Sequence, residues 1–252
     1  MVHILDALIA QTTAKAARVT CTDIVVGSHW TMVEVAEEGS RCAGLAASLQ
    51  DSSNHHHDAG YPVRHAGALL TYPVVELLNL VLSDHMVEVS IGFATLNALL
   101  DVDKRLCQEL NAFDLIVERG SGYNIAVVGH FPFVPRLKSV AKQLWVLERD
   151  PHGDDLPASE APDILPKADV VAITGTSLAN GTFDGLLALC KPGAFIVVLG
   201  ATTPLSPILL GVGVSAIAGT LVEDPVAVKL AVSQGATFRQ IKGKRLVTMM
   251  HD

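Results

Sequence analysis

The sequence predicts an α/β protein whose second half is a Rossmann-like, doubly wound parallel sheet, preceded by a smaller α+β domain. Half of the 252 residues are hydrophobic but only 5% are aromatic, so the apolar content is mainly Ala, Val, Leu and Ile, the residues that fill helix-covered parallel sheets. After residue 124, short apolar runs alternate with helical patterns. This alternation indicates parallel strands joined by right-handed crossovers.

The net charge of the chain indicates which partners to exclude, and the spacing of its cysteines indicates its compartment. A net charge of −8 and a pI near 5.6, without a cluster of Lys and Arg, argue against a nucleic-acid partner. The four cysteines lie far apart with no CxxC spacing, which predicts free thiols in a reducing, cytoplasmic compartment.

No segment of the sequence has the pattern of a signal peptide or a membrane span. The start lacks a basic region and reaches Asp6 before any apolar run develops. The uncharged stretch 192–222 is long enough to span a membrane, but its prolines and glycines indicate buried strands with loops. We therefore expect a soluble protein with no membrane partner.

The first hundred residues carry both helical and extended patterns. Apolar spacing predicts a helix over 3–18, and β-branched runs predict a hairpin from 19–26 and 31–35. A Gly, Ser, Asn and His-rich loop spans 50–60, and helices follow Pro73 and cover 85–100. A polar, glycine-rich break at 118–123 then places the domain boundary, giving domains 1–118 and 119–252.

The second half repeats a strand and helix unit. Strands are predicted at 124–129, 145–148, 169–173, 194–199 and 214–218. Leu137, Val140, Ala141 and Leu144 have the spacing of an amphipathic helix, and further helices are expected at 182–190 and near 207–210. Asp224 at the N-cap, Pro225 at the first helical position and Gly235 beyond the end mark the last helix.

Loops at the carboxyl ends of parallel strands open onto one crevice, where ligands bind. These loops are expected at 129–133, 148–150, 174–181, 200–206 and 219–220. The 174–181 loop leads to a helix amino terminus, which attracts anions. Its candidate ligand-binding residues are Thr174, Gly175, Thr176, Ser177 and Asn180. Alternatively, Asn180 or Thr182 only caps the helix; Pro204 of the 200–206 loop is a candidate that equally well starts a helix.

The first strand-to-helix turn lacks GxGxxG, because the bulky His130, Phe131 and Pro132 follow Gly129. Ordinary NAD binding is therefore disfavoured. Glu148 stands where dinucleotide folds place a ribose-binding acid, but a solvated carboxylate explains it equally well. His130 leaves the strand into the predicted crevice, so we consider it as a metal ligand, a proton carrier or a structural histidine.

Two other places carry potential metal ligands. His55, His56, His57 and Asp58 form a run of imidazole and carboxylate groups, although a histidine run in a loop is more often solvated. Glu88 lies on a predicted helix whose Gly92, Ala94 and Ala98 permit close packing, and its burial would require a partner.

Five spaced motifs together resemble those of a family of prokaryotic proteins called the putative heavy-metal chelation family. They are Glu88-x-x-Ile-Gly-x-Ala-x-x-Asn-Ala98, Val128-Gly-His-Phe-Pro-Phe133, Ile173-Thr-Gly-Thr-x-x-x-Asn-Gly-Thr182, Thr203-Pro-Leu-Ser-Pro207 and Ala218-Gly-Thr-x-Val-x-Asp-Pro225. The resemblance implies an enolase amino-terminal-like domain before the Rossmann-like one, and a cleft between them. It implies as site residues Glu88, Asn97, His130, Thr176, Asn180 and Thr202.

Two ligand-binding functions are open at this point, and a purely structural or regulatory module is a third possibility. The first is binding of a metal ion, or of a metal held by a small anionic chelator, with His130 and Glu88 as metal ligands and a transition metal ion as the bound species. The second is an enzyme acting on a small anionic metabolite or nucleotide-like cofactor, with His130 or Glu88 as general acid or base. The sequence assigns no catalytic residue, and a homo-oligomer is compatible with it.

Overall fold

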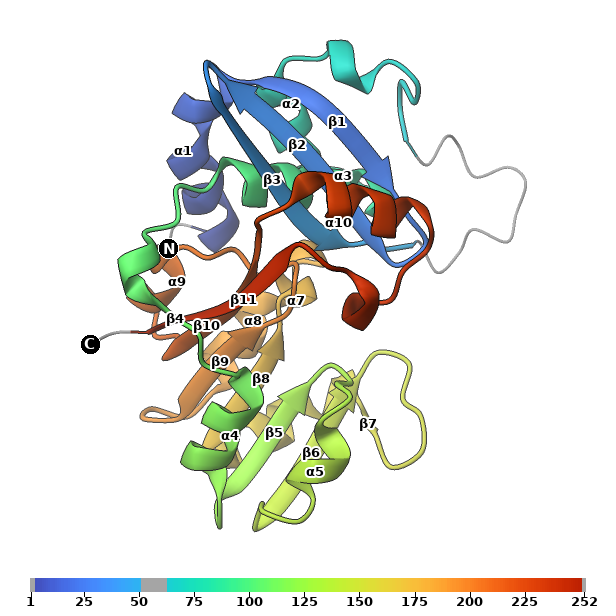
Figure 1. Ribbon diagram of the computed structural model, residues 1–252. Helices are drawn as coiled ribbons and strands as arrows, with labels where there is room; N and C mark the ends of the chain where they lie inside the picture. Colours follow the sequence, from blue (N-terminus) through green and yellow to red (C-terminus); the bar gives the residue numbers. More distant parts are fainter. Residues whose placement is uncertain (1–2, 51–62, 251–252) are drawn as a thin grey trace. The chain divides into compact units, whose positions relative to one another are not determined.

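The computed structural model describes residues 3–50 and 63–250 (Figure 1). The chain forms two compact units. The first unit comprises residues 1–102, 204–206 and 220–245, and the second comprises 103–203, 207–219 and 246–252.

The first unit combines a three-stranded antiparallel sheet with helices. The sheet order is β1-β2-β3. Its elements are α1 (Ile4–Ala16), β1 (Thr20–Val26), β2 (Trp30–Glu37), β3 (Ser40–Ala47), α2 (Val74–Asn79), α3 (Met86–Leu99) and α10 (Pro225–Ser233). Helix α10 packs on β1 and β2, so a segment late in the sequence completes this unit.

Helix α3 is the central element of the first unit. Almost every residue of α3 is buried, in keeping with a helix that is apolar around its circumference. Its backbone lies directly on β3 at Gly44, where a Cβ atom would stand 2.1 Å from the carbonyl oxygen of Ala94. Gly92 permits an equally close approach of the chain at Val81. Glycines thus set the spacing between α3 and its neighbours.

The second unit is built on an eight-stranded sheet with the order β4-β11-β10-β9-β8-β5-β6-β7. The strands are β4 (Cys107–Gln108), β5 (Asn124–Val128), β6 (Gln143–Glu148), β7 (Leu156–Pro157), β8 (Val170–Thr174), β9 (Phe195–Leu199), β10 (Ala216–Val222) and β11 (Lys244–Met250). Strands β7, β6, β5, β8, β9 and β10 pair parallel with one another in this order. Strands β4 and β11 pair antiparallel.

Counted from β5, the parallel strands lie in the order 3-2-1-4-5-6. This is the order of doubly wound nucleotide-binding sheets, and it reverses between β5 and β8. The connections contain α4 (Ala112–Gly120), α5 (Val134–Leu137), α6 (Ala161–Ile164), α7 (Thr176–Ala179), α8 (Phe183–Leu189) and α9 (Pro207–Gly211). Short 3-10 helices lie at Leu69–Thr71, Leu80–Leu82, Lys104–Leu106, Ala158–Glu160, Leu165–Lys167 and Phe238–Gln240.

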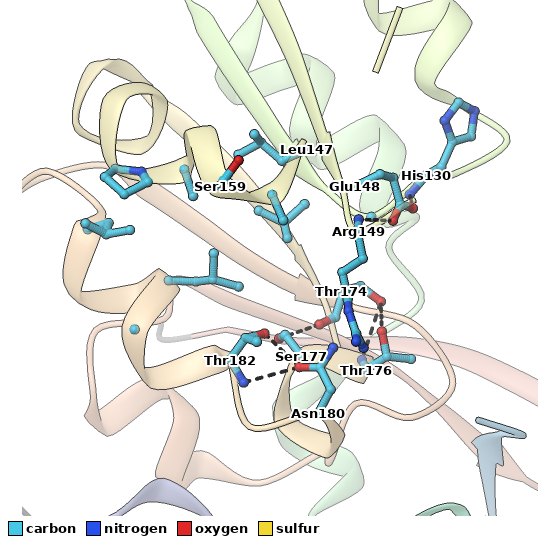
Figure 2. A pocket seen from close by; sticks show the side chains of 18 of the residues that line it. His130, Leu147, Glu148, Arg149, Ser159, Thr174, Thr176, Ser177, Asn180 and Thr182 are labelled. Atoms are coloured by element: carbon cyan, nitrogen blue, oxygen red, sulfur yellow. Dashed lines mark hydrogen bonds between the residues drawn. The ribbon is translucent and has the colours of Figure 1, made fainter. Parts of the chain in front are cut away.

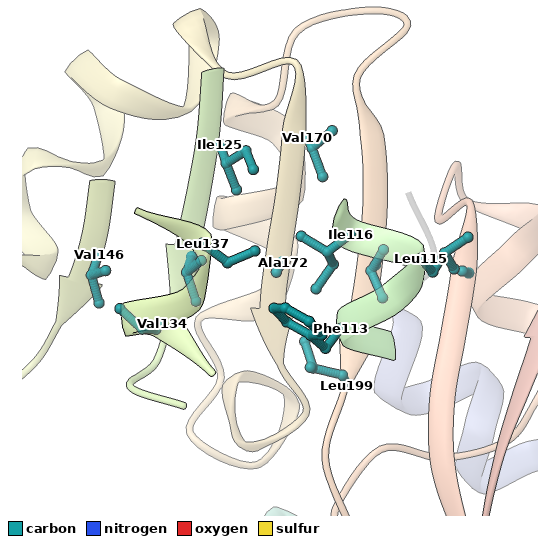
Figure 3. Close-up of a cluster of buried hydrophobic side chains, with 13 residues drawn as sticks. Phe113, Leu115, Ile116, Ile125, Val134, Leu137, Val146, Val170, Ala172 and Leu199 are labelled. Carbon is teal, nitrogen blue, oxygen red and sulfur yellow. The ribbon is translucent and has the colours of Figure 1, made fainter. Parts of the chain in front are cut away.

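Both faces of the parallel sheet are buried. On one face, Ile125, Val127 and Ala172 pack with side chains of α4 and α5, including Phe113 and Leu137 (Figure 3). The alternate residues of the same strands, such as Val171 and Ile173, are fully buried on the other face. Burial on both faces explains why these strands are almost uninterrupted apolar runs in the sequence.

The predicted fold class is confirmed: a small antiparallel sheet accompanies a larger, mostly parallel one. The helix expected over 137–144 is wrong, because α5 ends at Leu137 and Leu144 belongs to β6, where it pairs with Ile125. Its apolar spacing combined residues of a turn with residues of a buried strand. The expected loop 174–181 contains the short helix α7, and β3, β4, β7 and β11 were missed.

The loop expected over 50–60, with the run from His55 to Asp58, lies largely outside the described residues. Within the described part of the chain, no helix is long and apolar enough to cross a membrane.

The close approach of β3 and α3 predicts the effect of a single methyl group. Gly44→Ala should lower the free energy of unfolding by about 3 kcal/mol, at the upper end of overpacking costs, because backbone atoms surround the new Cβ and cannot turn away. Gly211→Ala in α9, where nothing lies within 4 Å of the added Cβ, is the matched control and should be neutral or slightly stabilising. Urea denaturation measures both, and equal effects would contradict the packing described.

Candidate functional site

A cavity of about 560 Å³ lies within the second unit, where β5, β6 and β8 end (Figure 2). Its volume is within the range of small-molecule sites, and carboxyl strand ends beside a switch in strand order are where such sites form. Its polar lining includes His130, Glu148, Arg149, Thr174, Thr176 and Asn180. Three of the five predicted loops therefore contribute to one cavity.

The Glu148 carboxylate joins two of these loops. One of its oxygens accepts a hydrogen bond from the backbone N–H of His130 at 2.5 Å, and the other accepts from the backbone N–H of Arg149 at 3.1 Å. A carboxylate is acceptor-only and can satisfy several donors at once. The turn after β5 and the turn after β6 are thus held together by one side chain.

The imidazole of His130 is oriented by a second carboxylate. Its Nδ1 lies 2.9 Å from Oδ2 of Asp155, whose side chain is 6% exposed, whereas the His130 side chain is half exposed. The backbone N–H of His152 also approaches Asp155, at 3.4 Å. When one imidazole nitrogen is bonded to a carboxylate, the other is available to a metal or a proton. Here that atom is Nε2.

The segment after β8 presents hydroxyl groups to the cavity. The hydroxyls of Thr174 and Thr176 lie 3.0 Å apart (Figure 2). Asn180 accepts bonds through Oδ1 from the backbone N–H and hydroxyl of Thr182, at 3.2 and 2.7 Å. Asn180 therefore supports the start of α8, as the simpler interpretation of the sequence expected.

Ser177 lines the same cavity but is nearly fully buried, and its hydroxyl donates to the carbonyl oxygen of Thr174 at 2.7 Å. That bond accounts for the serine as part of the turn. Gly175 is required by packing, since a Cβ there would lie 2.3 Å from Oγ1 of Thr203.

Arg149 brings a cation to the cavity. In Figure 2 its side chain extends from the end of β6 toward Thr174 and Thr176. No carboxylate of the described residues forms an ion pair with its guanidinium group. A guanidinium group recognises carboxylates and phosphates in a planar, bidentate way, so Arg149 is suited to meet an anionic ligand.

The remaining wall is apolar. It is formed by residues at the end of β6, in the 3-10 helix before α6, in α6 and in α8. These residues are Leu147, Ala158, Ala161, Pro162, Leu186 and Leu189. Ser159 adds one hydroxyl to this side. A cavity with one apolar wall and a few convergent polar groups is typical of organic ligands.

Two predicted site residues of the 200–206 loop do not line this cavity. Thr202 and Pro204 are buried, and so is Ser206, whose hydroxyl donates to Oε1 of Gln11 at 2.7 Å. A ligand role for Thr202 and Pro204 stays a prediction.

Glu88 and Asn97 lie on α3 in the first unit. The Glu88 carboxylate accepts hydrogen bonds from the backbone and guanidinium N–H groups of Arg64, at 2.7 to 3.2 Å, and from Ser83 at 2.5 Å. Burial would raise the pKa of Glu88, but the hydrogen bonds from Arg64 and Ser83 outweigh it and lower the pKa to about 2. Glu88 has the partner that its burial requires, and metal binding would have to displace Arg64.

Asn97 donates through Nδ2 to the carbonyl oxygen of Leu45 at 3.0 Å, which ties α3 to β3. Its role in binding also stays a prediction. Among residues 3–50 and 63–250, no group of three or more His, Cys, Asp and Glu side chains is placed to hold a metal ion. The run from His55 to His57 lies outside these ranges.

Sequence reasoning singled out neither Asp155 nor Ser159, and it placed Arg149 in a predicted loop without assigning it a role. Asp155 lies in a polar segment before β7 that carried no motif, and only the folded chain brings it to His130. Arg149 and Ser159 gave no signal beyond their residue types. The acid at the end of the second strand, Glu148, was noticed because of its distance from Gly129 in the sequence.

Two family models match the chain, both described as putative heavy-metal chelation. One, DUF4213, matches residues 9–100, and the other, DUF364, matches residues 111–251. The second match alone covers more than half of the chain.

An uncharacterized protein of Methanocaldococcus jannaschii is 28% identical over 202 residues, which cover 77% of this chain and 76% of that protein. Two solved structures of DUF364 family proteins with unknown function are similar. The one from Pyrococcus horikoshii has a TM-score of 0.82 at 22% identity, covering 99% of this chain and 100% of the other. The one from Desulfitobacterium hafniense has a TM-score of 0.81 at 25% identity, covering 98% of each.

The contacts of Glu88 predict how the stability of the protein depends on pH. Glu88→Gln should lower the free energy of unfolding at pH 7 by about 1.5–3 kcal/mol, the range for hydrogen bonds to charged groups. The folded pKa of about 2 lies below the ordinary 4.5, so the wild-type advantage is complete above the unfolded value and declines as pH falls toward 2.

Urea denaturation at pH 7 and pH 3 measures both effects. Glu76→Gln, at an exposed position of α2, is the control and should change little at either pH. A Glu88→Gln deficit that stays the same at both pH values would show that the ion pair with Arg64 is not its source.

Proposed function

Because the chain belongs to the putative heavy-metal chelation family, we propose that it binds a small anionic molecule that carries a metal ion. The observation that supports this most is the His130 imidazole, which is hydrogen-bonded to Asp155. His130 lines the cavity together with Arg149, whose guanidinium group forms no ion pair within the described part of the chain. The imidazole is suited to the metal. The guanidinium group is suited to the anion.

The arrangement of ligands favours a chelated metal over a bare ion. A protein site for a bare transition metal ion commonly supplies three or four ligands, and no such group exists in the described part of the chain. A metal already held by a small chelator needs few bonds from the protein. His130 would contribute one bond through Nε2, while Arg149, Thr174 and Thr176 contact the chelator.

We also propose the finer domain assignments, an enolase amino-terminal-like domain over 1–118 and a Rossmann-like domain over 119–252. The strand order of the parallel sheet supports the Rossmann-like assignment. Contributions of Glu88, Asn97, Thr202 and Pro204, from a cleft between the domains, are part of the same proposal. They are testable by Ala substitution in the binding assay below.

A second candidate is an enzyme acting on a small anionic metabolite or a nucleotide-like cofactor. The carboxylate-bound imidazole of His130 favours it, because an oriented histidine is also a common general acid or base. Metal-free protein that gains as much thermal stability with an organic anion alone as with metal and anion together would support this candidate. The metal-carrier proposal expects the larger stabilisation with metal and anion together.

Isothermal titration with Zn²⁺ alone, citrate alone and Zn²⁺ with excess citrate tests the proposal. The protein carries no affinity tag, and His55, His56 and His57 are replaced by Ala so that this run cannot bind zinc. We expect the zinc–citrate mixture to bind more tightly than either component. In that background, His130→Ala should weaken zinc–citrate binding at least about tenfold, the scale of losing a metal contact or its support.

His29→Ala, at an exposed position in the first unit, is the matched control and should leave the affinity unchanged. Asp155→Asn should weaken binding to an intermediate degree, because it leaves the imidazole in place but removes the charge that orients it. Equal zinc–citrate affinity in the His130→Ala protein and its background would remove His130 from the proposed site.

A further inference from the structure

The polar and apolar sides of the cavity in the second unit have different chemistry. Leu147, Pro162, Leu186 and Leu189 form an apolar wall, while Glu148 and Arg149 bring charge to the end of β6. A flat apolar ring can lie against the first side, and a polar, anionic portion of the same molecule can reach the second. The cavity therefore favours a ligand with a flat apolar ring at one end and a polar, anionic group at the other.

The Glu148 carboxylate has capacity for additional donors. Each of its oxygens accepts one backbone N–H, from His130 or from Arg149. An ionised carboxylate offers about four acceptor positions, so each oxygen can accept one more hydrogen bond. Two neighbouring hydroxyl groups of a ligand would satisfy both. An acid at the end of the second strand binds ribose hydroxyls in this way in doubly wound folds.

The anionic portion is matched by the groups beside Glu148. The guanidinium of Arg149 forms no ion pair within the described residues, and its side chain extends toward the hydroxyls of Thr174 and Thr176 (Figure 2). A planar fork of N–H donors with nearby hydroxyls suits the oxygens of a phosphate group. Because Arg149 provides one positive charge, we expect the ligand to carry a single phosphate group.

The turn after β5 argues against a longer, dinucleotide ligand. Gly129 has a φ of +103°, and its Cβ position is only 3.0 Å from Cβ of Thr174. The ring of Phe131 lies 3.4 Å from the same Cβ position, and it stacks on the ring of Phe133 with the ring centroids 5.1 Å apart. A pyrophosphate needs close approach to a glycine-lined turn, and this turn is filled by side chains.

We propose that the cavity binds a nucleoside monophosphate. The base lies against the apolar wall, the two ribose hydroxyls donate to Glu148, and the phosphate meets Arg149 with Thr174 and Thr176. The inference rests on the proposed function, since it names the class of the small anionic molecule. It requires no metal, which allows the two to be tested separately.

Isothermal titration of the full chain in EDTA with AMP, GMP, CMP and UMP provides the test. We expect at least one of the four to bind, and to bind about tenfold or more tightly than its 2′-deoxy form, which lacks one of the two hydroxyls. We expect NAD⁺ to bind at least tenfold more weakly than that monophosphate. The comparison of ligands uses the wild-type protein and does not depend on any variant folding.

Two substitutions assign the contacts. Glu148→Gln should abolish the preference for the ribonucleotide over its 2′-deoxy form, whereas Glu38→Gln, at an exposed position in the first unit, should preserve it. Arg149→Ala should weaken binding of the monophosphate at least tenfold and leave binding of the corresponding nucleoside unchanged.

Absence of binding by all four monophosphates would overturn the inference, and so would equal affinity for the ribo and 2′-deoxy forms. NAD⁺ binding as tightly as the monophosphate would also overturn it. These outcomes are distinct from failure of the proposed function, which is measured with zinc–citrate and His130→Ala. A protein that binds zinc–citrate but no nucleotide would keep the first proposal and lose the second.

Discussion

The carboxylate of Glu148 is the contact on which the geometry of the candidate site depends. By accepting the backbone N–H groups of His130 and Arg149, it fixes two turns that leave neighbouring parallel strands. Those turns position the imidazole of His130 and the guanidinium group of Arg149 among the described residues that line the cavity. Asp155 then orients the imidazole, and the packing of Gly129 against Thr174 brings the hydroxyl-bearing segment after β8 alongside. If the Glu148 carboxylate accepted no backbone N–H groups, the two turns would not be linked, and these side chains would lie on independent loops.

The sequence predicts the sheet well because its strands are buried on both faces. Val171, Ala172 and Ile173 all lie in the core, so the strand appears as an uninterrupted apolar run. The Asp224-Pro225 start of α10 is confirmed by the hydrogen bond from the N–H of Ala227 to Asp224. The pattern misleads where apolar residues of two successive elements happen to have helical spacing. The helix predicted over 137–144 is such a case, because Leu137 ends α5 whereas Leu144 pairs in β6. Strands of two residues, β4 and β7, are too short to carry any period.

The candidate site was predictable only in part. Residues directly after predicted strands, such as His130 and Thr176, could be placed because parallel strands end at one edge of a sheet. Asp155 could not, since it follows β6 at a distance and no motif marks it. For Glu88 and Asn97 the helix was predictable, but their contacts with Arg64 and with the carbonyl of Leu45 depend on long-range packing. Those contacts give both residues a structural role in the first unit, and their role in binding stays a prediction.

The central claim is that His130 presents Nε2 to a metal carried into the cavity by a small anion. A crystal structure of the full chain soaked in zinc–citrate, with anomalous scattering recorded at the zinc edge, tests it most directly. The account predicts a zinc peak about 2.0–2.1 Å from Nε2 of His130, with citrate oxygens completing the coordination near Arg149. A structure with zinc bound elsewhere, and with His130 still paired to Asp155 but making no metal contact, would contradict the account.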